Sequence, residues 1–503
     1  MPRPTQTESV TLPMKSSPFA VLVSHVNQVM RRLRGASPLL AAVIVVLLGC
    51  SSRAAAPGDG SELPWRAGVA VRNLTPSGPI WLAGYAARNA PSTGVDLEVH
   101  AKALALDDRC GGRVVIVTMD LIRVPHALRV YVESEVEKRF GLKPHEILLN
   151  ASHTHSAPEV EPERLILEPV FRLSAKPRDI AAVNAYQKFL RETIVELVGE
   201  SLATPFPARL DYFHARAGFA MNRRRLEANG SVSNNPNPDG PVDHDVPVLR
   251  VSGAEGRPRA IVFGYACHNT TLNGSLLSSD YAGYAQRGIE EAYPGATALF
   301  VAGCGGDQNP YPRHGSVHGK KPGDLAADHG NTLANAVLAA LTTRGRTVTG
   351  ALRVAYGQAL LSYETPQQAD LAAFTREKFP PEVLERADVL RNMLERKESP
   401  APFPCPVQVL RFGHDLTLVA LGGEAVVDYS LRLKRELAGG AAVWVAGYSN
   451  DVFGYLGSSR VIREGGYEGG SANTRILNHP GRFAPLAEEA VIAKVHELLR
   501  QTD

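Results

Sequence analysis

The chain has 503 residues, of which 44% are hydrophobic and 21% are charged, and its formal net charge at pH 7 is +3. This composition is ordinary for a chain that buries a large core. No basic stripe stands out beyond the N-terminal region, which excludes nucleic acid as the main partner, because phosphate binding needs clustered lysine and arginine side chains.

The N-terminal region has the features of an export signal. Three arginines at positions 31–34 precede an apolar run at positions 39–48, which is too short to cross a bilayer comfortably as a mature helix. The run ends in Leu-Leu-Gly-Cys50, which resembles a bacterial lipobox with Cys50 as the lipidated first residue. We therefore expect an exported bacterial protein, either secreted or held in the cell envelope by membrane association through Cys50. The alternative is that this segment is not cleaved and anchors the protein in the membrane by its N-terminus.

This interpretation divides the chain into three parts. Residues 1–50 are the predicted signal, and Met30, just before the arginines, is a candidate for the true start. Residues 51–64 are small, polar and rich in Pro and Gly, which predicts a flexible linker. Residues 65–503 are the predicted catalytic domain.

The body of the chain alternates between strand-like and helix-like patterns. Apolar runs predict buried strands at Arg113–Met119, Glu146–Ala151, Arg259–Ala266, Ala298–Ala302, Val407–Phe412, Leu416–Leu421 and Val443–Ala446. Helical periodicity predicts helices at His126–Phe140, Asp179–Leu202, Tyr284–Ala292, Asp324–Leu341, Pro381–Lys397 and Leu486–Arg500. This alternation predicts an α/β fold in which helices flank mixed β-sheets.

Two kinds of connection stand out between these elements. Gly413-His414-Asp415 joins two apolar runs and predicts a hairpin, so some strands should be antiparallel. Residues 155–180 and 222–245 are rich in Pro, Asn and charge, and we expect them to form long loops over the site.

Side chains able to do chemistry follow five of the predicted strands. In chain order they are His153 and His155, His268, Asp307 and Asn309, Glu424, and Asn450 with Asp451. The crevice at the carboxyl ends of strands is where α/β sheets bind ligands. We therefore expect these residues to form the site.

His153 and His155 form an H-x-H pair. In an extended chain residues i and i+2 face the same way, so the two imidazoles suit one metal, or a metal ligand beside a hydrogen-bond donor. The alternative interpretation is that these two histidines lie in a polar loop and bind no metal. Glu424 ends an apolar run, where a buried carboxylate needs a partner that a metal would supply.

Five short motifs, in the same order and at comparable spacing, resemble those of the neutral/alkaline (non-lysosomal) ceramidases. The resemblance covers roughly residues 65–500. The motifs are Ala151–Ser156, Asn222-Arg223, Gly264–His268 followed by Ser278–Asp280, Gly422–Glu424, and Tyr455 followed by Tyr467-Glu468.

The resemblance implies an activity and a set of residue roles. It implies Zn²⁺ held by His153, His268, Glu424 and Tyr455, with His155, Arg223 and Tyr467 facing the scissile amide. Two histidines and a carboxylate are a known catalytic zinc set. The implied function is zinc-dependent hydrolysis of the amide bond in a lipid-like N-acylated substrate. Ceramide (N-acylsphingosine), which would give a sphingoid base and a fatty acid, is the candidate.

The sequence departs from the family pattern at two points. Asn309 stands where the family has a serine, and an asparagine cannot act as an alkoxide nucleophile, although it can hydrogen-bond a substrate. The family also carries a C-terminal β-sandwich domain, whereas this sequence ends at Asp503, so we expect a neutral-ceramidase-like catalytic domain without that module.

Two alternative functions stay open. One is a catalytically inactive, exported binding lipoprotein with the ceramidase fold, which Asn309 favours. The other is a metal hydrolase of the amidohydrolase barrel class, which also uses H-x-H after a strand.

Overall fold

The computed structural model describes residues 63–313, 317 and 319–502. The predicted signal, Cys50 and almost all of the predicted linker lie outside the described residues. Residues 62–503 form one compact unit. Within the described residues, no helix is both long enough and apolar enough to span a bilayer.

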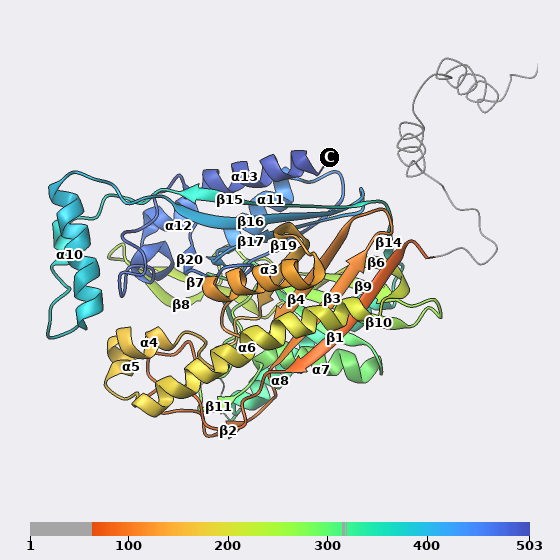
Figure 1. Cartoon of the computed structure of the whole chain (residues 1–503), viewed down its shortest axis with the longest axis horizontal. Helices are drawn as coiled ribbons and strands as arrows, with labels where there is room; N and C mark the ends of the chain where they lie inside the picture. Colours follow the sequence, from red (N-terminus) through yellow and green to blue (C-terminus); the bar gives the residue numbers. More distant parts are fainter. Residues whose placement is uncertain (1–62, 314–316, 318, 503) are drawn as a thin grey trace, which may run out of the picture. The chain divides into compact units, whose positions relative to one another are not determined.

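A large mixed sheet organises the first two thirds of the unit (Figure 1). Its strand order is β12-β10-β9-β6-β1-β3-β4-β5, and β14 pairs with β6. Only β4 with β5 and β10 with β12 run parallel among these pairs. The strands are β1 Trp65–Asn73, β3 His100–Asp107, β4 Arg113–Met119, β5 Ile147–Ala151, β6 Phe206–Arg216, β9 Asp245–Ser252, β10 Pro258–Tyr265, β12 Thr297–Ala302 and β14 Arg346–Val348.

A smaller sheet in the C-terminal third packs on one face of the large one. It has the order β15-β16-β17-β19, with β15 Leu352–Leu361, β16 Phe403–Phe412, β17 Leu416–Leu421 and β19 Ala442–Ala446. The hairpin predicted at Gly413 is confirmed, since β16 and β17 pair antiparallel across it and Gly413 has φ 54°. Buried side chains such as Ile116, Val262, Leu418 and Trp444 fill the space between the sheets.

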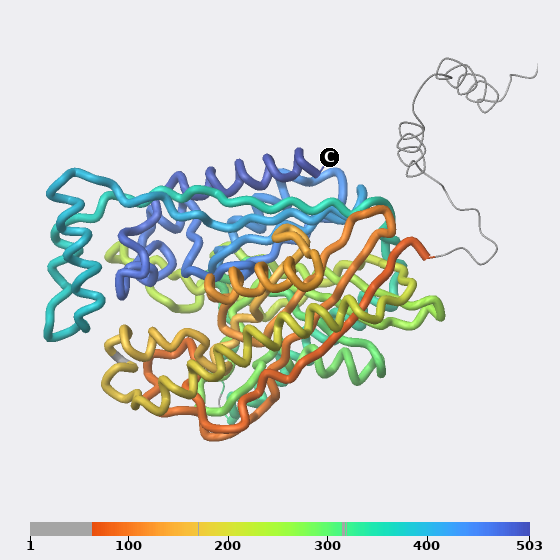
Figure 2. The backbone as a smooth tube through the Cα atoms, in the orientation of Figure 1, coloured from red at the N-terminus to blue at the C-terminus, as the bar shows by residue number. Residues whose placement is uncertain are grey.

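Helices cover both outer faces, which gives four layers (Figure 2). The helices α3 His126–Phe140, α6 Pro177–Ala203, α7 Asp280–Ala292 and α8 Pro322–Leu341 pack on the large sheet. The helices α11 Val427–Glu436 and α13 Ala487–Gln501 pack on the small one. Along β4, Val115 and Val117 face the helices and Ile116 faces the second sheet, as the two-residue period of a strand requires. The predicted α/β class with flanked mixed sheets is confirmed.

About half of each predicted loop is regular structure, so the expectation of long loops was wrong for those parts. Residues 155–180 contain α4 Pro162–Leu167, α5 Pro169–Arg172 and the start of α6. Each helix begins at a proline, which suits the first helical position even though it suggests a break in sequence. Residues 222–245 contain parts of the strands β7 Ala220–Leu226 and β8 Val232–Asn237 and the start of β9; β7 also pairs with β13 Gln308–Pro310.

The remaining elements are short, except for an arm between β15 and β16. This arm, residues 362–402, carries α9 Gln368–Leu371 and α10 Pro381–Glu395 and projects to the left in Figure 1. Its Leu371 and Leu390 pack on Leu477. The other short elements are β2 Gly94–Val95, η1 Pro144–Glu146, β11 Leu276–Leu277, β18 Glu424–Ala425, β20 Tyr455–Leu456, α12 Ser459–Glu464 and η2 Tyr467–Ser471.

Candidate metal centre

The ends of four strands bring the predicted ligands to one place. His153 follows β5 and His268 follows β10, while Glu424 on β18 pairs directly with Tyr455 on β20. The edge strands β5 and β12 also meet here, because the Asn150 side chain accepts from the Ala302 N–H at 2.9 Å and donates to the Gly447 carbonyl at 2.8 Å. Asn150 is fully buried, so this amide fixes the strand ends behind the site.

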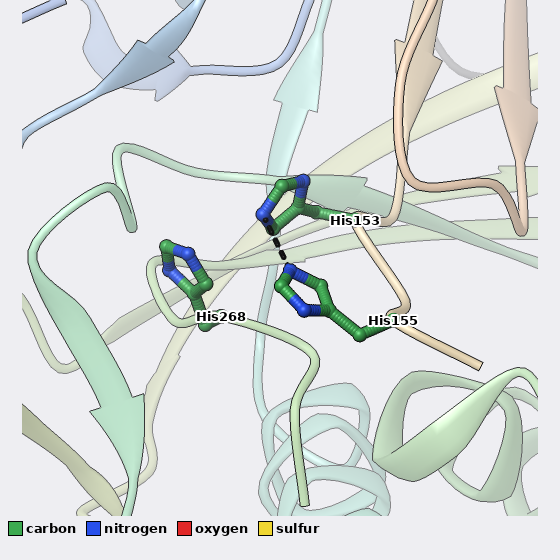
Figure 3. A group of neighbouring side chains, drawn as sticks. All are labelled: His153, His155 and His268. Atoms are coloured by element: carbon green, nitrogen blue, oxygen red, sulfur yellow. Dashed lines mark hydrogen bonds between the residues drawn. The ribbon is translucent and has the colours of Figure 1, made fainter. Parts of the chain in front are cut away.

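His153 and His268 lie close together with nearly perpendicular rings (Figure 3), and a backbone carbonyl holds the Nδ1 of each. The Nδ1 of His153 donates to the Ile122 carbonyl at 2.7 Å, and the Nδ1 of His268 donates to the Gly305 carbonyl at 2.7 Å. A carbonyl can only accept, so in each neutral ring the proton is on Nδ1 and Nε2 carries a lone pair. A second hydrogen bond of this kind is how metal-binding histidines are held.

The two Nε2 atoms converge on the carboxylate of Glu424. Glu424 Oε2 lies 3.2 Å from Nε2 of His153 and 3.4 Å from Nε2 of His268, and it has no hydrogen-bond donor. Three electron-rich atoms therefore face one another in a buried place, which is costly unless a cation sits between them.

Tyr455 completes the cluster. Its hydroxyl lies 3.4 Å from Nε2 of His268 and accepts from Nη2 of Arg223 at 2.8 Å. The Asn473 side chain holds the backbone of Tyr455 on both sides, at 2.8 Å and 2.9 Å. Burial raises the pKa of the Tyr455 phenol well above its usual value, and the nearby Arg223 opposes that rise. Without a bound cation, this phenol stays neutral at pH 7.

His155 is held differently from the two other histidines. The donor nitrogens of the three histidines all lie within 4.8 Å of one another, and Nε2 of His155 is 3.1 Å from Nε2 of His153. The Nδ1 of His155 is buried without a partner, so no carbonyl orients this ring as a ligand. This difference distinguishes His155 from His153 and His268.

Glycine 84 makes room for His155. A Cβ added at Gly84 would lie 2.4 Å from the His155 ring, and the φ of Gly84 is 94°, which disfavours other residues. Tyr85 packs edge-on against the same ring at 5.0 Å, and Arg88 donates to the His155 carbonyl at 2.7 Å.

The protonation states of the cluster suit metal binding. Burial lowers the pKa of His268 to about 3, and burial together with the other histidines lowers that of His155 well below its usual value. Burial alone would raise the pKa of Glu424, but positive charge on His153 and His268 would outweigh it and hold that pKa well below the usual range, and a cation bound between these residues would act in the same direction. His268 therefore offers a neutral imidazole at pH 7, which is the form that binds a metal.

These residues fit zinc. Tetrahedral zinc with ligands at 2.0–2.1 Å separates neighbouring ligand atoms by about 3.3 Å. Three of the separations among these atoms match that value: 3.2 Å for His153 to Glu424, 3.4 Å for His268 to Glu424 and 3.4 Å for His268 to Tyr455. Two imidazoles, a carboxylate and a phenol are also ligand types that zinc accepts.

A cavity of about 100 Å³ opens onto this cluster. His153, His155, Glu424, Tyr455 and Tyr467 all line it. The Tyr467 residue is 45% exposed, and burial raises the pKa of its phenol. It can therefore donate a hydrogen bond into the cavity at neutral pH.

Arg223 and Asn309 lie on the other side of Tyr455. Both line a separate cavity of about 540 Å³ beside β7 and β8. Nη1 of Arg223 donates to Oδ1 of Asn309 at 3.3 Å, and Nε of Arg223 donates to Glu468 at 2.7 Å. Of the three residues expected to face the amide, His155 and Tyr467 line the metal cavity, whereas Arg223 reaches the cluster through Tyr455. Asn309, at the family's serine position, reaches it through Arg223.

Two further residues support the site and had no role in the sequence interpretation. Glu468 is buried and pairs with Arg223 and Arg224, at 2.7 Å and 2.8 Å. The Tyr448 ring packs 4.5 Å from the His153 ring, and its hydroxyl lies 3.4 Å from Nδ1 of His268. Both lie in segments already singled out, since Glu468 adjoins Tyr467 and Tyr448 follows the last predicted strand.

Comparison with protein families gives a match over about half of the chain. Residues 65–310 match the family described as neutral/alkaline non-lysosomal ceramidase, N-terminal. Neutral ceramidases A and B of Dictyostelium discoideum are each 25% identical, over 283 and 289 residues, which is 52% and 53% of this chain. The matched parts span only 38% of each relative.

The fold also matches solved structures. The crystal structure of neutral ceramidase from Pseudomonas aeruginosa aligns with a TM-score of 0.67 at 19% identity, covering 88% of this chain and 75% of that chain. A structure described as ceramidase complexed with C2 aligns with a TM-score of 0.66, also at 19% identity. The predicted neutral-ceramidase-like fold is therefore confirmed.

Proposed function

Because this chain belongs to the neutral/alkaline non-lysosomal ceramidase family through its N-terminal domain at residues 65–310, we propose that it is a zinc-dependent hydrolase of the amide bond in an N-acylated lipid. Ceramide is the first substrate to test. We further propose that the protein is exported and that a lipidated Cys50 associates it with the bacterial envelope, as its N-terminal sequence suggests.

One observation carries the proposal. The Nε2 lone pairs of His153 and His268 point at a Glu424 oxygen that has no hydrogen-bond donor. A purely structural cluster would place a proton donor at this point, because buried polar atoms are normally paired. A divalent cation satisfies all three atoms together, with Tyr455 as a weaker fourth ligand.

Zinc held by these side chains would supply Lewis-acid activation of the amide carbonyl and of water. His155, which is neutral and next to the ligands, is placed to move a proton between water and the leaving amine. Tyr467 can donate a hydrogen bond to the developing oxyanion from the cavity wall. Arg223 positions Tyr455 through the 2.8 Å hydrogen bond between them.

Asn309 is the one feature that favours a second candidate function, a binding protein without turnover. Its amide is occupied by Arg223 on one side and by Asn234 on the other, each at 3.3 Å. The contacts of Asn309 are therefore those of a positioning residue, which is compatible with catalysis by the metal site.

Turnover with and without metal tests the proposal. Purified chain is incubated with a fluorescent N-acylsphingosine, before and after chelation and zinc replacement, beside Glu424→Gln. We expect hydrolysis that chelation removes and zinc restores, and a Glu424→Gln variant that has lost both zinc and turnover. Bound zinc with no cleavage of any amide would support the binding protein instead, and Glu424→Gln with full zinc and full turnover would refute the role of Glu424.

A further inference from the structure

The arm encloses a cavity next to the metal centre. This arm cavity has a volume of about 870 Å³, and apolar side chains from the arm and from the loop after η2 line much of it: Leu371, Ala373, Phe374, Phe379 and Leu477. Binding sites for small molecules typically have volumes of about 300–1,000 Å³ and largely apolar walls. The rest of the lining is more polar and includes the charged residues Glu364, Asp370, Arg475 and Arg482. The size and the apolar part of the lining therefore suit a hydrocarbon chain.

The arm cavity and the metal cavity share a wall made of residues 466–475. Tyr467 and Asn473 line the metal cavity, whereas Gly466 and Thr474 line the arm cavity. Arg475 lines both, and its side chain is 39% exposed. A ligand that begins at the metal and passes Arg475 therefore reaches the apolar walls of the arm.

The metal cavity is too small and too polar for a long hydrocarbon chain. Its volume is about 100 Å³, and charged residues line it beside the ligands: Arg123, Arg164, Glu168 and Arg475. These side chains pair with one another, as Glu168 does with Arg164 at 2.7 Å and with Arg475 at 3.3 Å. Burying a long hydrocarbon chain against these ion pairs would remove water from their charged groups, so only the part of the chain that crosses at Arg475 would lie beside them.

We propose that the arm cavity binds the hydrocarbon chain of the substrate's acyl group, an inference that rests on the proposed amidase function. The amide would lie at the metal cavity, the chain would cross the wall at Arg475, and its methylenes would pack on Phe374, Phe379 and Leu477. Each buried methylene favours binding by about fourfold, so long acyl chains are preferred.

A second apolar cavity on the arm provides an internal control. It has a volume of about 660 Å³, and Val389, Met393 and Pro402 contribute to its lining. Among the described residues, it shares no lining residue with the metal cavity, and it shares Leu477 and Pro480 with the arm cavity, whereas Val389 and Met393 line it alone. Filling it should not affect the acyl chain.

The test fills each cavity with a tryptophan. Ala373 is exposed and lines the arm cavity, so Ala373→Trp occupies that space without disturbing the core. Thr474→Trp fills the cavity from the opposite wall, at a half-buried residue whose hydroxyl donates to the Gly470 carbonyl at 3.3 Å. Val389→Trp, at a residue 57% exposed, is the matched control. Thermal unfolding verifies that each variant is folded.

The readout is the ratio of kcat/KM for the N-hexadecanoyl and N-acetyl forms of one sphingoid amine. We expect this ratio to fall at least about tenfold in Ala373→Trp and Thr474→Trp, which corresponds to about two methylenes returned to water, and to keep its wild-type value in Val389→Trp. An unchanged ratio in both cavity variants, or an equal fall in Val389→Trp, would overturn the inference.

A binding measurement separates this inference from the proposed function. If the wild-type chain cleaves neither amide, the proposed function fails, and calorimetric binding of hexadecanoate then tests the cavity alone. Weaker binding to Ala373→Trp than to the wild type and Val389→Trp would still support an acyl-chain site. Equal binding to all three would overturn it.

Discussion

Nε2 of His153 lies 3.2 Å from Oε2 of Glu424, and in the neutral ring neither atom carries a proton to place between them. His153 follows a strand of the large sheet and Glu424 lies on β18 of another sheet, far along the chain. The contact therefore depends on the tertiary fold, which brings these strand ends together. A cation between the two atoms explains why such a contact is tolerated in a buried place.

Removing His155 should separate metal binding from turnover. In His155→Asn we expect zinc content to stay at the wild-type level and kcat to fall by about 10²-fold or more, because a positioned acid or base contributes that much. Elemental analysis and amide hydrolysis measure the two quantities. His414→Asn in the exposed β16–β17 turn is the control. Loss of zinc together with activity would instead make His155 a ligand.

Asn309→Ser tests the departure from the family pattern. Asn309 contacts Arg223 at 3.3 Å and lies outside the metal cavity, so we expect unchanged zinc content and a change in kcat/KM of about tenfold or less, the worth of one hydrogen bond. Steady-state kinetics on the N-acylsphingosine substrate give the result. A gain of several orders of magnitude would mean that the serine is indispensable and that the natural chain lacks it.

Gly84→Ala should damage both stability and activity. Its Cβ would overlap the His155 ring, and the left-handed backbone there costs a non-glycine residue about 1–3 kcal/mol. Gly78→Ala is the control, since a Cβ at Gly78 meets nothing within 4 Å. Urea unfolding and kcat of the two variants give the comparison. Equal stability and equal kcat in Gly84→Ala and Gly78→Ala would contradict this prediction and would show that the His155 ring can move to accommodate the added Cβ.

An ion-pair network that joins α11 to β9 should make stability depend on pH. Hydrogen bonds from His214, and then from Lys434, hold the pKa of Asp245 well below its usual value. The ionised Asp245 contributes fully to the free energy of unfolding above the pKa of aspartate in the unfolded chain, about 3.9. This contribution is lost as the pH falls toward the lower pKa of Asp245 in the folded protein. Urea unfolding should show Asp245→Asn less stable than the wild type at pH 7, and the difference should shrink below about pH 4. A difference that does not change with pH would contradict this account.

The strands predicted most accurately are those buried on both faces. Arg113–Met119 and Leu416–Leu421 are unbroken apolar runs, and the structure has β4 and β17 with these bounds. Strand β7 escaped prediction because it carries Arg223 and Arg224, which look exposed in sequence. Glu468, far along the chain, pairs with both and allows their burial, and such a pairing is invisible in a local pattern.

The types of residue at the site could be predicted, but their orientation could not. A histidine or carboxylate after a buried strand is visible in the sequence, as with His153, His268 and Glu424. The backbone carbonyls of Ile122 and Gly305 orient the two imidazoles through hydrogen bonds from Nδ1. Every residue has a backbone carbonyl, so the sequence does not reveal which ones will make these bonds. The separation of Asn309 from the metal cavity likewise depends on how β7 and β13 pair.

The most direct test of the account is the zinc content of the purified chain beside that of His153→Ala. We predict about one zinc per chain for the wild type and almost none for the variant, because removing one of two imidazoles opens the site to water and leaves the remaining ligands without a closed geometry. Equal zinc in both proteins, or no zinc in the wild type after incubation with the metal, would contradict the assignment of this cluster as a metal centre.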